Sequence, residues 1–188
     1  VLIIVGAIAM RGNPFFVQAR PGKKGKDGRE KIFYLIKLRS MSNKCGTNGE
    51  LLPDDQRLGR YGAFLRSTSL DELPSLVNIV LGQLAIVGPR PLLVAYLPRY
   101  SARQRRRHEV RPGLTGYAQA YGRNLLTWEE KFEKDVYYVD NLSFWLDVKI
   151  IFKTISVVLK REGITSDTSV TMEEFMGVEK EMKVINHE

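Results

Sequence analysis

Cysteine and histidine are scarce in this chain of 188 residues. The single cysteine, Cys45, excludes an internal disulfide bond and is typical of a protein from a reducing compartment. With only two histidines beside it, the sequence lacks the ligand spacing of a zinc site. Internal repeats and low-complexity segments are also absent, so the length predicts one domain with a modest core.

The first ten residues, Val1 to Met10, are uncharged and apolar but too few to cross a membrane. As a helix they would reach about 15 Å, half of the roughly 30 Å hydrocarbon core of a bilayer. We expect no signal peptide, because no basic segment precedes the run and no small-residue cleavage site follows it. Composition alone makes a buried core helix one interpretation of this run.

Negative charge is in the minority, since 21 Asp and Glu accompany 29 Lys and Arg and leave a net charge of +8. Basic residues are dense from Arg20 to Lys44 and again from Arg99 to Arg111. Such a balance suits nucleic acid, an anionic membrane or a polyphosphate substrate. Nucleic-acid binding would use several aromatic side chains, and only Tyr100 is close to the second run. We therefore expect its arginines to be mostly solvated, with lipid headgroups as better partners than nucleic acid.

The stretch from Arg66 to Pro91 carries the most chemistry. It places two adjacent carboxylates, Asp71 and Glu72, at the front of an apolar run. Ser69 and Glu72 have the spacing of a capping box, so a helix start is the structural interpretation. Asp71 is an alternative N-cap, because Pro74 would then lie in the first turn, where it costs little. In either register, backbone N–H groups converge on the carboxylates and favour their ionised form.

A phosphoryl-transfer site is the second interpretation of the same stretch. Arg66 and Arg90 bracket the carboxylates with guanidinium groups suited to bidentate phosphate contacts. The two prolines of Gly88-Pro89-Arg90-Pro91 stiffen the turn that presents Arg90. A carboxylate nucleophile beside a possible metal-binding carboxylate completes such a site. Spacing alone leaves both interpretations open, because the capping-box pattern is common.

The early part of the chain predicts a β-hairpin. Phe15 to Ala19 and Lys31 to Met41 have the composition of strands, and a turn rich in Gly and Lys, Gly22 to Gly28, separates them. In the second strand, the period of two places Lys37 on the same face as Leu35. We therefore expect a packed strand that carries one basic side chain among apolar neighbours.

Elsewhere the patterns predict mostly helices, so the fold class is α+β in a single domain. Thr127 and Glu130 form a second capping box, at the start of a helix that reaches Tyr137. The longest helix, at 143–161, belongs either to the core or to a membrane interface. Further expectations are helices at 57–66 and 100–110, a surface loop at 42–55, an extended piece at 116–119 and a polar tail from Gly163.

A series of short motifs resembles one protein family. SLDELP from Ser69, an apolar run and then VGPRP from Val87 are similar to the bacterial sugar transferases, specifically the small monotopic phosphoglycosyl transferases. The resemblance covers most of the chain, because further motifs occur in the family's order. They are QARPG from Gln18, KLRSM from Lys37, RPGLTG from Arg111 and GRN from Gly122. GELLPDD from Gly49 and PLL from Pro91 resemble the enzymes that initiate bacterial N-linked glycan assembly.

The resemblance implies a monotopic membrane protein on the cytoplasmic face of the bacterial inner membrane, in contact with anionic lipids. Residues 1–14 would be the remnant of a re-entrant membrane helix that lacks its first half. Residues 15–188 would be a catalytic domain that faces the cytosol. Val1 to Met10 would then lie in the membrane and not in the core.

The resemblance also implies a reaction. A UDP-sugar would donate its phosphosugar to polyprenyl phosphate, normally undecaprenyl phosphate, with release of UMP, at the start of glycoconjugate assembly. Asp71 matches the family's nucleophile, which forms an aspartyl-phosphosugar intermediate, and Glu72 matches the acid that helps to hold Mg²⁺. We expect the helix start and nearby arginines to keep Asp71 ionised. No nucleic acid would take part, and neither the sugar nor the oligomeric state follows from the sequence.

Basic residues of the motifs match positions that meet substrate phosphate. Arg90 matches the arginine of the family's Pro-Arg-Pro turn. Arg66 and Arg111 occupy family-like positions, and Lys37 and Arg39 are implied to face the active site or headgroups. Because the diphosphate donor is negatively charged, these cations and Mg²⁺ would neutralise it before a carboxylate approaches.

Two positions depart from the family pattern. Gln83 stands where many relatives have an acid, and Tyr121 where asparagine is common. We interpret both as bearing on sugar choice or packing. Other functions stay open: a basic nucleic-acid-binding module, a membrane-associated interaction protein without catalysis, and a carboxylate-dependent hydrolase. Release of UMP from a panel of UDP-sugars, with and without polyprenyl phosphate, would separate them.

Overall fold

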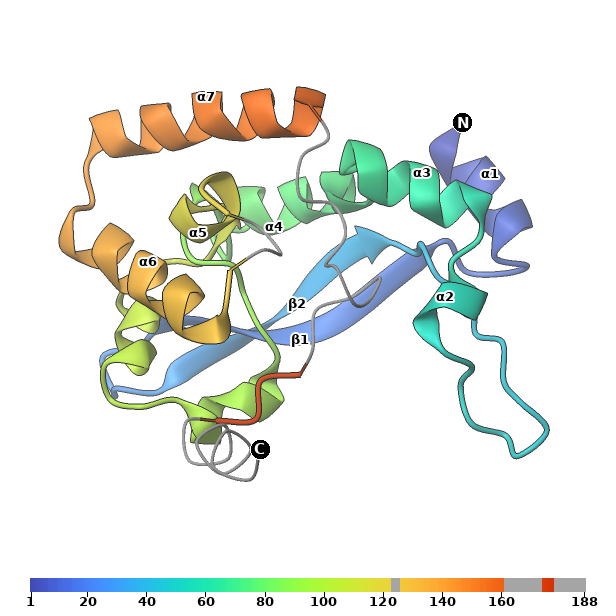
Figure 1. The fold of residues 1–188 in the computed structure, drawn as a ribbon, viewed down its shortest axis with the longest axis horizontal. Helices are drawn as coiled ribbons and strands as arrows, with labels where there is room; N and C mark the ends of the chain where they lie inside the picture. The colour runs from blue at the N-terminus through green and yellow to red at the C-terminus, as the bar shows by residue number, and fades with distance from the viewer. Residues whose placement is uncertain (123–125, 161–173, 178–188) are drawn as a thin grey trace, which may run out of the picture.

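The computed structural model describes residues 1–122, 126–160 and 174–177. The chain folds as the predicted α+β domain, in which one β-hairpin crosses the molecule diagonally and helices lie around it (Figure 1). The hairpin pairs β1 (Phe15–Lys24) with β2 (Glu30–Leu38) in antiparallel register. Because β1 continues to Lys24, the turn is shorter than the predicted Gly22 to Gly28.

One face of β2 packs into the domain. Phe33 and Leu35 are buried there, and Lys37 follows on the same face, so the predicted alternation is confirmed. Phe33 and Leu35 form a hydrophobic cluster with Leu84, which the chain reaches just after the acid-bearing segment. The hairpin is therefore the support against which that segment is placed.

The acid-bearing segment is not the single capped helix that the sequence predicts. Ser69 ends the preceding helix, α3 (Arg60–Thr68), in a left-handed conformation with φ of 57°, and its side chain makes no capping bond. The acids lie in a 3-10 helix, η1 (Leu70–Ser75), followed by the short α4 (Leu76–Val80). Ser69 therefore holds the N-cap position of η1, as one predicted register has it, but without the side-chain bond of a capping box, and the alternative N-cap at Asp71 is wrong.

Side chains of this segment fill the open edge of β2. Ser75 Oγ donates to the Ile36 carbonyl at 2.8 Å. Asn78 Oδ1 accepts from the Ile36 N–H at 3.1 Å, and its Nδ2 donates to the Tyr34 carbonyl at 2.8 Å. Both side chains are buried, so they satisfy backbone groups that a third strand would otherwise pair.

A second sheet, which the sequence analysis missed, pairs β3 (Ala85–Val87) with β4 (Gly113–Thr115) in parallel. The crossover between them contains two 3-10 helices, η2 (Val94–Arg99) and η3 (Gln104–Glu109). The helix predicted at 100–110 is therefore shorter and of a different type.

Two other predicted elements also differ in the structure. The expected helix at 57–66 is divided between α2 (Asp54–Arg57) and α3, which starts after Gly59. The expected extended piece at 116–119 is mostly a short helix, α5 (Tyr117–Ala120). The surface loop predicted at 42–55 is confirmed as far as α2.

The arginines of the basic crossover are bound to carboxylates. The ion pairs are Arg103 with Glu133, Arg105 with Glu30, Arg106 with Glu109 and Asp140, and Arg107 with Asp135. Arg107 is buried, so the expectation of a solvated face is wrong for this residue. Most of the partners lie on β2 and on helix α6 (Trp128–Asp140), so these ion pairs hold the crossover against the rest of the domain.

Helix α6 (Trp128–Asp140) begins at the predicted capping box. Thr127 Oγ1 accepts from the Glu130 N–H at 3.2 Å, and the Glu130 carboxylate accepts from the Thr127 N–H at 2.9 Å. Of the polar tail predicted from Gly163, only residues 174–177 are described. Phe175 is fully buried among four aromatic rings, those of Tyr96, Tyr100, Trp128 and Phe132.

Helices α1 (Leu2–Ala9) and α7 (Phe144–Lys160) expose large apolar side chains. The core interpretation of α1 is wrong, because its isoleucines are half or more exposed. In α7, Ile150 and Val157 are buried while Trp145 and Phe152 are exposed, so this helix has both a core face and an exposed apolar face. Among the described residues, no helix combines the length and hydropathy needed to span a membrane.

We predict that Asn78→Ala weakens the whole fold. Its side chain makes three hydrogen bonds, and its loss leaves buried backbone groups of β2 unpaired. We expect the free energy of unfolding to fall by about 2–3 kcal/mol in urea titrations. Asn141→Ala removes a single bond at an exposed helix end and should cost less than about 1 kcal/mol. Equal losses in the two variants would contradict the edge-filling role.

Candidate active site

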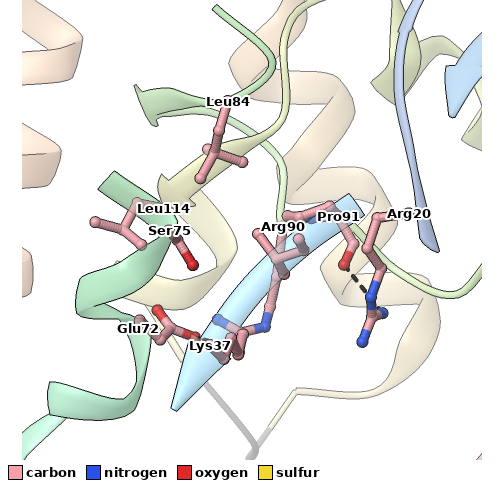
Figure 2. Close-up of a pocket in the computed structure, with 10 residues that line it drawn as sticks. Arg20, Lys37, Glu72, Ser75, Leu84, Arg90, Pro91 and Leu114 are labelled. Atoms are coloured by element: carbon pink, nitrogen blue, oxygen red, sulfur yellow. Dashed lines mark hydrogen bonds and ion pairs between the residues drawn. The ribbon is translucent and has the colours of Figure 1, made fainter. Parts of the chain in front are cut away.

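A pocket opens between the hairpin, the acid-bearing segment and the crossover (Figure 2). Its lining residues are Arg20, Leu35, Lys37, Glu72, Ser75, Leu84, Arg90, Pro91, Gly113 and Leu114. Apolar and charged side chains therefore share one concave surface, and the charged ones are mainly cations. In Figure 2, Lys37, Glu72 and Arg90 point toward one another from three separate elements.

Glu72 lies at the centre of the charged cluster. Its Oε1 atom is 2.6 Å from Lys37 Nζ and 2.8 Å from Arg90 Nη2. Burial would raise the pKa of Glu72, but the attraction and hydrogen bonds of Arg90 and Lys37 outweigh it and lower the pKa to about 2. Glu72 is therefore a firmly ionised carboxylate with a cation on each side.

Asp71 adjoins Glu72 but differs from it electrostatically. Burial is the largest effect and raises the pKa of Asp71, Glu72 raises it further, and Lys37, Arg90 and Arg66 oppose the rise. Of the two influences expected to keep Asp71 ionised, the nearby arginines do lower its pKa, while the helix start is a 3-10 turn and not a regular α-helix. Among the described residues, its carboxylate has no hydrogen-bond or ion-pair partner, and so it is available to react.

The other predicted phosphate-binding residues are placed differently. Arg66 Nε donates to Ser40 Oγ at 3.1 Å, so this guanidinium contacts the segment that follows β2. Its positive charge lowers the pKa of Asp71. The backbone N–H of Arg39 donates to the Pro14 carbonyl at 2.7 Å. The side chain of Arg111 is exposed. In the described part of the chain, neither Arg39 nor Arg111 is bonded to the charged cluster.

Arg20 is a pocket residue that the sequence analysis did not select. It belongs to β1, and its Nη1 donates to the Pro91 carbonyl at 3.2 Å, next to Arg90 (Figure 2). Burial and the nearby charge of Arg90 lower the pKa of Arg20 to about 10. The sequence signal that could have identified Arg20 as a site residue is its place in the QARPG motif, which is one of the motifs that resemble the family.

The two departures from the family pattern lie in packing contacts. The Gln83 side chain accepts a hydrogen bond from Asn78 Nδ2 at 2.8 Å. The Tyr121 ring stacks on Tyr117 with centroids 4.5 Å apart. Of the GRN motif, only Gly122 is described. These contacts favour packing over sugar choice for both residues.

The carboxylates suit a divalent cation that is held mainly by its substrate. Within residues 1–122, 126–160 and 174–177, no three His, Cys, Asp or Glu side chains gather closely enough to hold a metal. Mg²⁺ commonly uses one or two carboxylates and takes its other ligands from water and substrate phosphate. Both ion pairs of Glu72 use its Oε1 atom, so its second carboxylate oxygen is the one that could bind a cation. Together with the neighbouring carboxylate of Asp71, it supplies such a donor set. The residues therefore fit Mg²⁺ that binds together with a phosphate.

Comparison with known proteins identifies the family of this chain. Residues 1–161 match the sequence model of the family described as bacterial sugar transferase. This chain belongs to that family. An uncharacterized sugar transferase of Bacillus subtilis (strain 168), EpsL, is 49% identical over 179 residues, which cover 94% of this chain and 86% of the relative.

Other relatives of this sugar transferase have more specific names. The UDP-galactose-lipid carrier transferase of Erwinia amylovora is 48% identical, over 74% of this chain and 32% of the relative. The UDP-glucose:undecaprenyl-phosphate glucose-1-phosphate transferase of Xanthomonas campestris pv. campestris is 37% identical, over 84% of this chain and 34% of the relative. The chain thus spans most of the Bacillus protein but only about a third of the other two.

We predict that Glu72 makes the stability of this sugar transferase depend on pH. Since its pKa is about 2 in the folded state and ordinarily 4.5, its contribution is present above about pH 5 and is lost as the pH falls toward 2. Glu72→Gln should lower the free energy of unfolding by about 2–3 kcal/mol at pH 7. The difference from the wild type should shrink steadily between pH 5 and pH 2 in denaturant titrations.

Glu50→Gln is the matched control, because Glu50 lies exposed in the loop between β2 and α2. Its difference from the wild type should stay below about 0.5 kcal/mol. A Glu72→Gln penalty that does not change with pH would contradict the assignment of the low pKa to this residue.

Proposed function

We propose that this sugar transferase moves a phosphosugar from a UDP-sugar to a polyprenyl phosphate and releases UMP. The observation that supports the proposal most strongly is the meeting of Glu72, Lys37 and Arg90 at one pocket, with Asp71 next to Glu72 in the chain and within the influence of the same cations. Relatives named as transferases that use UDP-galactose or UDP-glucose and a lipid carrier favour the same chemistry. The name of the Xanthomonas relative gives undecaprenyl phosphate as its acceptor.

The charges of the pocket suit a diphosphate. Arg20, Lys37 and Arg90 line it, and Glu72 is the one acid among the lining residues. The remaining positive charge would attract the donor and offset the charge that accumulates on its leaving group. When bound, Mg²⁺ would be held by Glu72 with Asp71 beside it, and would neutralise phosphate charge and polarise the phosphorus–oxygen bonds.

Asp71 is the proposed nucleophile. One of its carboxylate oxygens attacks the phosphorus that carries the sugar, the bond from that phosphorus to the UMP oxygen breaks, and UMP leaves with the electron pair. An oxygen of the lipid phosphate then attacks the same phosphorus and releases the Asp71 carboxylate. Two steps allow UMP to leave first, so the two anionic substrates need not share a small pocket. Glu72, between two cations, is less suited to attack because its charge is already engaged.

Membrane attachment is part of the proposal, because the acceptor is a lipid. Exposed apolar side chains occur on α1, α3, α4 and α7, and these helices lie toward the upper side of the molecule in Figure 1. The exposed residues include Ile4, Ile8, Phe64, Val80, Leu81, Phe144, Trp145, Phe152 and Leu159. Large contiguous apolar surfaces mark membrane or protein contacts in soluble domains. The acid pair lies directly before α4, so a lipid phosphate held at this surface would be close to Asp71.

We predict a covalent intermediate and a metal requirement in the UMP-release reaction. With UDP-glucose, UDP-galactose or UDP-N-acetylgalactosamine alone, the protein should release up to one equivalent of UMP and gain the mass of a phosphosugar. Added undecaprenyl phosphate should make release continuous, and EDTA should stop it. Because burial raises the pKa of Asp71, turnover should fall in acid at a higher pH than for an ordinary aspartate.

Asp71→Asn should abolish both the adduct and the turnover, because an amide cannot replace the attacking oxygen anion. Asp55→Asn, in the exposed part of the chain before α3, is the control and should behave as the wild type. Normal lipid-dependent turnover without an adduct would exclude the covalent route. Release of free sugar phosphate to water would indicate a hydrolase, and the absence of UMP from every donor would refute the proposed function.

We also predict that the exposed apolar side binds anionic vesicles. Leu81→Asp and Leu159→Asp should each weaken co-sedimentation by about tenfold if the leucine enters the bilayer. Leu51→Asp is the matched control, because Leu51 is 56% exposed in the loop between β2 and α2, which extends away from that side (Figure 1). Equal binding by all three variants would contradict attachment through this surface.

A further inference from the structure

The turn that carries Arg90 is held through all three of its carbonyl groups. Pro89 O accepts from the Gly113 N–H at 3.0 Å. Arg90 O accepts from Arg107 Nη2 at 2.7 Å, and Pro91 O accepts from Arg20 Nη1 at 3.2 Å. Because proline has no N–H, the carbonyls of such a turn are its main means of attachment. The backbone of Arg90 is therefore fixed from outside the turn.

The guanidinium of Arg107 is itself held by a buried carboxylate. Arg107 is 3% exposed, and its Nε and Nη2 donate to Asp135 Oδ2 at 3.0 and 2.7 Å. Its Nη1 donates to the Tyr100 hydroxyl at 3.3 Å. Arg107 comes from η3 and Asp135 from α6, so the pair joins two elements behind the pocket. Neither residue lines the pocket.

The side chain of Arg90 is held much less firmly than its backbone. It is 46% exposed, and its Nη2 donates to Glu72 Oε1 at 2.8 Å. A long side chain with this exposure has rotamer freedom, so its guanidinium is directed mainly by where its backbone lies. A small displacement of the turn would move the guanidinium relative to Glu72 and to any phosphate in the pocket.

We propose that Arg107 and Asp135 are positioning residues, which fix the Arg90 carbonyl and thereby aim the Arg90 side chain at substrate phosphate. This inference rests on the proposed function for the substrate it invokes. A buried ion pair is costly to desolvate, and replacing both members by apolar residues is often tolerated. Stability alone therefore does not require this pair, whereas the pair does place a side-chain donor on the Arg90 carbonyl.

The test compares two ion pairs that join the same two elements. Arg107→Met with Asp135→Leu removes the buried pair without leaving an unpaired charge. Arg103→Met with Glu133→Leu removes the exposed pair between the N-cap residue of η3 and α6, whose atoms are 2.6 Å apart. Arg107→Lys is a second variant, because it keeps the charge opposite Asp135 but has no second nitrogen for the Arg90 carbonyl. All variants are measured as full chains in the same detergent.

The first measurement is turnover with the donor that the wild type uses. We expect Arg107→Lys and the buried-pair variant to lose roughly 10- to 100-fold in kcat with little change in KM, and the exposed-pair variant to lose less than twofold. In an Arg90→Ala background, the same Arg107 changes should cost less than about threefold, because the side chain they position is gone. Equal losses in both backgrounds, or wild-type kcat in the two Arg107 variants, would overturn the proposal.

The second measurement needs no turnover. The order parameter of the Arg90 Nε–H group, from ¹⁵N relaxation of the protein without substrate, should fall in both Arg107 variants and stay unchanged in the exposed-pair variant. An unchanged order parameter in variants that remain folded by thermal denaturation would refute the positioning role. If the wild type turns over no UDP-sugar, the proposed function fails, while this measurement still decides whether Arg107 orders Arg90.

Discussion

Two buried polar side chains on the edge of β2 determine where the candidate active site of this sugar transferase is located. Ser75 and Asn78 bind the backbone of Tyr34 and Ile36, so the segment that ends in them lies along the strand. Glu72 is one 3-10 turn before Ser75, and Lys37 follows Ile36, which explains why these two charges meet at 2.6 Å although 35 positions separate them in the sequence. The pocket is then completed by the crossover, whose Pro-Arg-Pro turn brings a second cation to the same carboxylate.

The two acids share a peptide bond but have opposite electrostatic surroundings. Glu72 is paired on both sides and stays ionised, whereas Asp71 is partly buried without a partner among the described residues, and its pKa is raised. Pairing makes one carboxylate a fixed part of the structure, and the lack of a partner for the other is compatible with its proposed role as nucleophile. A difference of this kind commonly separates the roles of neighbouring carboxylates in enzymes.

Local signals in the sequence were sufficient for part of this arrangement. The capping box of Thr127 and Glu130, the alternation in β2 and the extent of α7 all follow from contacts within a few residues, and all are confirmed. The capping box at Ser69 failed because the previous helix ends there and tertiary contacts set the register of η1. The β3–β4 pairing and the burial of Arg107 depend on partners distant in sequence, as does the entry of Arg20 into the pocket. The acid pair and Arg90 could be selected from motifs, but their meeting could not be derived from spacing.

The filled edge of β2 has a consequence for how copies of this protein behave toward each other. A two-stranded sheet normally presents bare backbone groups on both sides, and exposed Ile32 and Tyr34 would add to the tendency of such a strand to recruit another. The Tyr34 carbonyl and both the N–H and the carbonyl of Ile36 are already bonded to side chains of the same molecule, so an incoming strand finds this part of β2 occupied. This part of the β2 edge is thereby protected from edge-to-edge pairing while its apolar neighbours remain exposed.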